Sequence, residues 1–169
     1  MNIQNAIESR RSVRKFETCT IPEEDFKTIL KAGMMAPSAC NSRPWEFVVI
    51  KDPEMVEKIA VIHPFARQIR QAGHAILISG LPSTQSSIAT GFWPQDCGAV
   101  AQNIILSAQE LGYASCWCGV YPNERLIAPF VDLFELGEGV VPTALIILGK
   151  AAEEPSAKGF YEDTKVKWC

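Results

Sequence analysis

The spacing of apolar residues along the chain predicts helices interleaved with short buried strands. Between Pro22 and Pro37 the apolar residues fall on one helical face, and three acidic residues directly follow Pro22, as is typical of a helix start. The strongest helical pattern covers 95–111 and is closed by Gly112, where a glycine ordinarily ends a helix. Further helices are predicted at 2–9, 53–61 and 123–134, and strands at 46–50, 75–79, 113–121 and 140–148.

Two of these patterns indicate how the elements are layered. The run 143–148 is apolar without alternation, which predicts a central sheet covered on both faces. The helix at 95–111 is apolar over most of its circumference, so it is expected to be buried on more than one side. Without internal repeats or a linker, residues 1–169 are expected to form one α+β or α/β domain, with 80–94 as a long loop that serves as a lid or an interface arm.

Charge adds one local feature to this picture. The chain has a formal net charge of −3, yet 10–15 contains four cationic residues among six positions. A nucleic-acid coat would need a broad basic face, so one short cluster suggests a small anion instead. The alternative is structural, because basic residues at a helix C-terminus complement the helix dipole without any ligand.

Other sequence features narrow the chemistry. No apolar stretch resembles a signal peptide or a membrane span, so a cytoplasmic location is expected, with the six cysteines mostly reduced. No CxxC pair is present and the two histidines, His63 and His74, stand among apolar neighbours, which favours structural roles over a zinc site. Hydrolase, Walker and Rossmann motifs are also missing from the sequence. Any demanding chemistry is therefore expected to come from a cofactor.

Three segments in order then become specific: RRSVRKF, APSACNSRPWEFVVI and QDCGAVAQNIILSAQELGYASCWCGVYP. Together they resemble the nitroreductase family of FMN-dependent oxidoreductases, over nearly the whole chain. The resemblance implies an α+β fold with a central, mostly antiparallel sheet covered by helices. It also implies an intertwined homodimer in which residues of both subunits hold each FMN.

The resemblance answers the question of the anion, which would be the FMN phosphate. It implies that Arg10 and Ser12 bind this phosphate, with a further donor from the backbone N–H of Arg11. Arg14 would lie beside N1 and the C2 carbonyl of the flavin and stabilise its reduced form. A further cation at the phosphate would come from Lys158 or from Lys150.

Two other segments match flavin-contacting parts of the family. The loop containing Pro37, Ser38, Ala39 and Asn41 would reach the flavin of the partner subunit, where the Asn41 amide can pair with the polar edge of the ring. The segment Trp117, Cys118 and Gly119 would lie alongside the isoalloxazine, with the backbone N–H groups of Cys118 and Gly119 facing N5 and O4. Trp117 fits a core position equally well.

The implied reaction passes electrons from NAD(P)H through FMN to an electron-poor small molecule of the nitroaromatic or quinone type, in a ping-pong cycle. No catalytic acid or base of the protein is obligatory for it. The alternatives are a flavoenzyme of the same fold with other chemistry, such as reductive dehalogenation or flavin breakdown, and a non-catalytic flavin-binding protein. Binding to nucleic acid or to a membrane is not expected.

Overall fold

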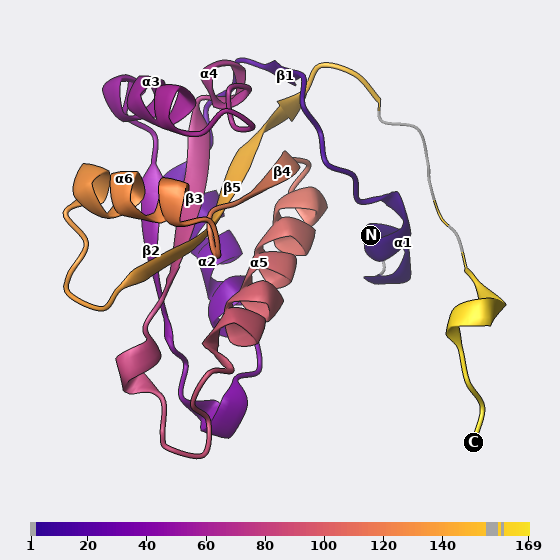
Figure 1. Cartoon of the computed structure of the whole chain (residues 1–169). Helices are drawn as coiled ribbons and strands as arrows, with labels where there is room; N and C mark the ends of the chain where they lie inside the picture. The colour runs from indigo at the N-terminus through magenta and orange to yellow at the C-terminus, as the bar shows by residue number, and fades with distance from the viewer. Residues whose placement is uncertain (1–2, 155–158, 160) are drawn as a thin grey trace.

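The computed structural model describes residues 3–154, 159 and 161–169 (Figure 1). The helices are α1 (Ile3–Ser9), α2 (Glu23–Met34), α3 (Pro53–Ile62), α4 (Ile69–Ala72), α5 (Trp93–Glu110) and α6 (Glu124–Phe134). The strands are β1 (Phe16–Glu17), β2 (Trp45–Ile50), β3 (His74–Gly80), β4 (Ala114–Gly119) and β5 (Val141–Ala151). Three short 3-10 turns are η1 (Ala39–Asn41), η2 (Pro82–Thr84) and η3 (Asp163–Lys165).

The strands form one five-stranded sheet in which every pairing between strands is antiparallel. β2 pairs with β3, β3 pairs with β5, and both β4 and β1 pair with the far edge of β5. β5 is the longest strand and holds β4 along Ala144–Gly149 and β1 at Lys150–Ala151. Helices cover the sheet, so the predicted α+β class with a mostly antiparallel sheet is confirmed.

The two faces of the sheet explain the apolar runs. Successive residues of β3 and β5 point to opposite faces. Leu77 and Ile147 pack in one core beneath α3, α4 and α6, whereas Ile78 and Ile146 pack in a second core beneath α2 and α5. The strands need apolar residues at every position because both faces are covered.

The helices largely follow the sequence prediction. α5 begins two residues earlier than expected, and Gly112 takes a left-handed φ of 84° directly after its C-cap, as predicted. α2 begins immediately after Pro22, which is its N-cap residue. The short elements α4 and β1 were not predicted, since four- and two-residue segments carry too little periodicity to be recognised.

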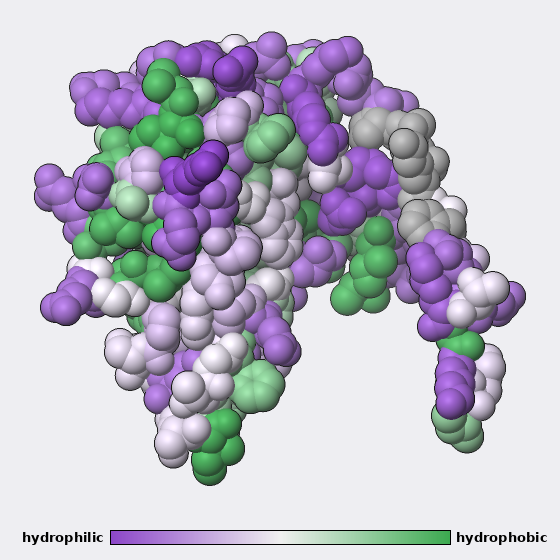
Figure 2. Space-filling model, viewed as in Figure 1, coloured by the Kyte–Doolittle hydropathy of each residue, from purple (hydrophilic) through white to green (hydrophobic). Residues whose placement is uncertain are grey.

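Both ends of the chain extend away from the sheet. Figure 1 shows α1 and residues 161–169 to one side of the sheet, and Figure 2 shows residues 161–169 as a strip of mixed polar and apolar surface. Ile3, Ile7, Tyr161 and Trp168 are exposed on these ends, Trp168 by 86%. Over the described part of the chain, none of the helices combines the length and apolar character that crossing a bilayer requires.

Candidate functional site

The cationic segment lies along the free edge of β4. Ser12 forms an isolated parallel bridge with Ser115, and the Val13 N–H donates to the Ser115 carbonyl at 2.9 Å. Val13 is buried while Ser12 and Arg14 on either side of it are exposed. The buried valine therefore anchors the segment and leaves the flanking polar side chains at the surface.

The arginines of this segment are bound to different degrees. Arg11 Nη1 donates to the carbonyls of Glu8 and Arg10 at 2.7 and 2.6 Å, which caps the end of α1. This confirms the structural alternative for one cation of the cluster. Arg14 makes one long bond, from Nη1 to the Ser12 carbonyl at 3.4 Å. Within the described residues, no hydrogen bond or ion pair engages the Arg10 side chain.

β4 separates a packed face from an open one. Cys116 and Cys118 point into the core, whereas Trp117 remains 40% exposed on the opposite face. A Cβ built on Gly119 meets no atom within 4 Å, so open space borders the strand at this residue.

The alternation of backbone groups along β4 refines the expected donors. In an antiparallel strand, the N–H and C=O of one residue point to the same side and those of the next residue to the other. Ser115 faces the cationic segment and Val120 donates to Thr143 on the β5 side, so Trp117 and Gly119 face the free edge. The Cys118 N–H is thereby directed toward β5, which does not favour its predicted contact with a flavin.

The two buried thiols share one amide donor. Gln68 Nε2 lies 3.4 Å from Cys116 Sγ and 3.6 Å from Cys118 Sγ, and Cys118 Sγ donates to the Phe65 carbonyl at 3.4 Å. The hydrogen bond from Cys118, together with Gln68 and the charge of Arg14, lowers the pKa of Cys116 to about 6. The same hydrogen bond and burial raise the pKa of Cys118.

His63 has the structural role expected of it. Its Nε2 lies 3.0 Å from the Gly119 carbonyl, which can only accept, and its Nδ1 accepts from the Phe65 N–H at 3.3 Å. The ring is 2% exposed and packs edge-on against Phe130. His63 is therefore a satisfied, neutral core histidine that fixes the end of β4.

The loop between α2 and β2 is the other predicted flavin segment. Ser38 and Ala39 are half-buried, whereas Pro37 and Asn41 are exposed. Asp96, in the first turn of α5, accepts from the Ala39 N–H at 3.0 Å. Sequence reasoning missed Asp96, although it stands at the start of the strongest predicted helix, where an acidic residue is a recognisable signal.

The structure joins some of the predicted residues and keeps others apart. Ser12 pairs directly with Ser115, so the segment that carries Arg10 and Arg14 meets the strand that carries Trp117 and Gly119. The α2–β2 loop lies at the lower end of Figure 1, far from the α1–β1 segment at the upper right. Lys150 pairs within the sheet through β1, and Lys158 falls outside the described residues.

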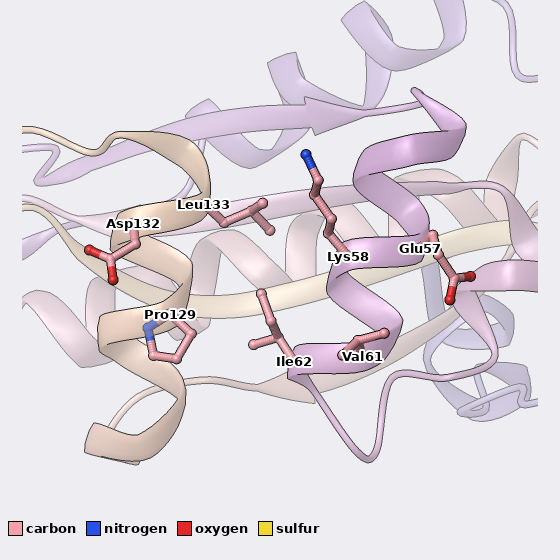
Figure 3. Close-up of a pocket in the computed structure, with 7 residues that line it drawn as sticks. All are labelled: Glu57, Lys58, Val61, Ile62, Pro129, Asp132 and Leu133. Atoms are coloured by element: carbon pink, nitrogen blue, oxygen red, sulfur yellow. The ribbon is translucent and has the colours of Figure 1, made fainter.

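Surface hollows add little to this assignment. A hollow of about 180 Å³ borders the cationic segment between α1, α5 and β4 and is lined by Arg11, Val13 and Ser115, among others. A larger hollow of about 560 Å³ lies elsewhere, between α3 and α6, where Figure 3 shows Ile62 directed toward Pro129 and Leu133. That groove is mainly apolar and contains none of the predicted site residues.

Known proteins are similar to this chain over nearly its whole length. A sequence profile described as "Nitroreductase family" matches residues 7–72 and 64–150. A protein of Methanothermobacter thermautotrophicus named "Putative NADH dehydrogenase/NAD(P)H nitroreductase" is 39% identical over 99% of this chain and 88% of its own length. A crystal structure of a protein with that name from Parabacteroides distasonis is 29% identical, with a TM-score of 0.92 over 98% of this chain and 96% of that one.

A second similar structure contains a ligand. It is that of "a putative nitroreductase in complex with fmn" from Desulfovibrio desulfuricans, which is 26% identical to this chain. The TM-score is 0.83, and the match covers 98% of this chain and 96% of that one.

Proposed function

The chain belongs to the nitroreductase family, and we propose that it is an FMN-dependent oxidoreductase that passes electrons from NAD(P)H to an electron-poor small molecule of the nitroaromatic or quinone type. The observation that carries the proposal is the pairing of the Arg10–Arg14 segment with the free edge of β4. The pairing brings the cationic segment next to β4, the strand in which a Cβ built on Gly119 would meet no atom within 4 Å. We also propose that residues 1–169 act as one FMN-binding domain.

The residues present fit FMN. Arg10 and Ser12 supply a guanidinium and a hydroxyl for a terminal phosphate, and a guanidinium can bind phosphate through two parallel hydrogen bonds. A Cβ on Gly119 would meet no atom within 4 Å, so no side chain of this protomer blocks the approach of a planar ring at this point of β4. The Trp117 and Gly119 N–H groups on the free edge replace the predicted pair of Cys118 and Gly119 as donors toward that ring.

Residues of the chain then have three tasks. When bound, FMN accepts a hydride at N5 and delivers electrons to the second substrate. Arg10 and Ser12 bind its phosphate, and Arg14 places a positive charge beside the pyrimidine edge, where reduction adds negative charge. Trp117, which is 40% exposed on the same strand, would border the ring. NAD(P)H and the electron acceptor would use the same open side of the flavin one after the other, which is a ping-pong cycle.

We further propose that the active form is a homodimer. The apolar side chains on α1 and on the C-terminal segment are exposed in the single chain, and a partner subunit would cover them. The distance between the α2–β2 loop and the α1–β1 segment supports a site that two subunits complete. Sedimentation equilibrium is expected to give twice the chain mass, and a folded, flavin-loaded monomer would contradict this arrangement.

One set of measurements tests the function. Heat release followed by chromatography is expected to identify FMN, and rapid mixing with NADH or NADPH is expected to bleach the flavin absorption. Nitroaromatics and quinones should then reoxidise it, with parallel double-reciprocal plots for a ping-pong cycle. Recovery of FAD alone, or of a flavin that neither nicotinamide reduces, would overturn the proposal.

A further inference from the structure

The α2–β2 loop is held in an unfavourable backbone conformation. Cys40, Asn41 and Arg43 have φ values of 51°, 53° and 49°, in the left-handed region that non-glycine residues rarely adopt. Such residues persist only where surrounding contacts fix them, and they concentrate at ligand sites.

Several hydrogen bonds supply those contacts. The Arg43 N–H donates to Ser38 Oγ at 2.9 Å, and Ser42 Oγ donates to the Ala39 carbonyl at 2.7 Å. From outside the loop, Asp96 Oδ1 accepts from the Ala39 N–H. The loop is therefore held in this conformation by hydrogen bonds of the chain itself.

One further bond sets the orientation of the Asn41 amide. Arg43 Nε donates to Asn41 Oδ1 at 3.1 Å. A guanidinium has donors and no acceptor, so the amide oxygen must face Arg43. The Asn41 Nδ2 group is turned the other way, and the exposed end of this side chain is a donor.

Asp96 is a costly choice at its position. The residue is 7% exposed, and within the described part of the chain its Oδ2 has no hydrogen-bond partner. A neutral acceptor could bind the Ala39 N–H without burying a charge. A carboxylate makes a stronger, charge-assisted bond, which suits the task of holding a strained loop.

We propose that Arg43 and Asp96 are positioning residues that preset the Asn41 amide as a hydrogen-bond donor to the flavin. The proposal rests on the proposed function. A donor at this place recognises the carbonyl oxygens or the unprotonated ring nitrogens of the flavin edge. Neither Arg43 nor Asp96 was recognised from the sequence.

The test is a titration of the apoprotein with FMN. Binding is monitored by quenching of the flavin fluorescence and by the visible circular dichroism of the bound flavin. Asn41→Asp keeps an acceptor for Arg43 but removes the donor, so affinity should fall at least as far as in Asn41→Ala. Arg43→Ala and Asp96→Ala should each weaken FMN binding roughly threefold to tenfold, the range of one net hydrogen bond. Asp96→Asn, which keeps a neutral acceptor, should recover part of that loss.

A double-mutant cycle separates positioning from general damage. If Arg43 acts through Asn41, then Arg43→Ala should change affinity little in an Asn41→Ala background. Arg70→Ala, at an exposed arginine paired with Glu57, is the matched control and should bind FMN as the wild type does. Thermal unfolding of each apoprotein reports loss of fold independently.

Wild-type affinity in Asn41→Asp, or additive effects of Arg43→Ala and Asn41→Ala, would overturn the proposal. Unchanged affinity in Asp96→Ala would remove Asp96 from it. These results differ from failure of the proposed function, in which the wild-type protein itself would not bind FMN.

Discussion

The two segments proposed to bind the flavin differ in how many of their polar groups have hydrogen-bond partners within the chain. In the α2–β2 loop, backbone and side chains are tied together by bonds such as those of Arg43 to Ser38 and Asn41. In the Arg10–Arg14 segment, Val13 is anchored on Ser115 while the Arg10 side chain has no partner among the described residues. One segment is shaped in advance, and the other supplies charge that the ligand would neutralise.

This difference predicts how each segment contributes to affinity. A preorganised loop loses little conformational freedom on binding, whereas the side chains of Arg10 and Arg14, which are weakly held or unheld among the described residues, must be ordered at the moment of binding. The arginines gain more in return, because charge-assisted bonds to a phosphate are the stronger class. Substitutions in the cationic segment should therefore have larger effects on affinity than substitutions in the loop.

The largest expected effect is that of Arg10→Ala. Loss of a charged hydrogen bond to phosphate should weaken FMN binding by about 1.5–3 kcal/mol, measured by fluorescence titration. Lys15→Ala is the matched control, because Lys15 directly follows the Arg10–Arg14 segment but is paired with Glu153 at 2.8 Å. Equal losses in the two variants would show that the segment acts only through its total charge.

Substitutions at two glycines distinguish effects on the stability of the core from effects on FMN binding. A Cβ on Gly33 would lie 2.8 Å from Ile104 Cγ1, so Gly33→Ala overpacks the contact between α2 and α5, at a cost of roughly 1–3 kcal/mol that the helix propensity of Ala partly offsets. Its thermal midpoint should fall while the folded fraction binds FMN normally.

Gly119→Ala should show the opposite pattern. The added methyl meets only open space within the chain, so the unfolding midpoint of the apoprotein should hold. The same methyl occupies the space proposed for the ring, and FMN affinity should fall. Unchanged affinity in Gly119→Ala would show that the ring does not lie against this part of β4.

These contrasts also show what the sequence could predict. The unbroken apolar runs of β3 and β5, and the apolar residues around most of the circumference of α5, predicted a sheet with both faces covered. Burial on both sides requires apolar residues at these positions. Motif resemblance is the source of the prediction that the Arg10–Arg14 segment and the α2–β2 loop bind the flavin. The Gln68 bridge to the thiols and the Asp96 bond to Ala39 join residues far apart in the chain, and no local period encodes such contacts. The prediction that the Cys118 N–H faces the flavin did not take the strand register into account. Only the pairing of β4 with β5 fixes that register.

A smaller effect is expected when Arg14 is changed. If its charge lies beside the pyrimidine edge, Arg14→Ala should lower the midpoint potential of bound flavin, since the reduced form loses more stabilisation than the oxidised form. A loss of about 1 kcal/mol corresponds to roughly 20 mV for a two-electron couple. Redox titration at saturating FMN measures it, with Arg14→Lys expected to restore part of the potential. An unchanged potential would assign Arg14 to the phosphate or to solvent.

The smallest expected effect links Arg14 to the thiols on the packed face of β4. The pKa of Cys116 is lowered to about 6, first by Cys118 and Gln68 and to a lesser extent by Arg14. Because the pKa of this thiol in the folded state lies below its unfolded value of about 8.5, its thiolate stabilises the fold at alkaline pH, and this contribution is lost as pH falls through about 6. The raised pKa of Cys118 acts oppositely, so its contribution is lost as pH rises.

Ultraviolet thiolate absorption of the apoprotein measures this titration directly. One thiolate should form near pH 6, and Cys116→Ser should abolish it. Arg14→Ala should move the midpoint slightly upward, because a nearby cation that favours the thiolate is removed. Lys15→Ala should leave the midpoint unchanged, since its charge is held by Glu153. If the midpoint pH is the same in Arg14→Ala as in the wild type, the Arg14 charge is directed away from β4. The proposed position of Arg14 beside the flavin would then lose its support.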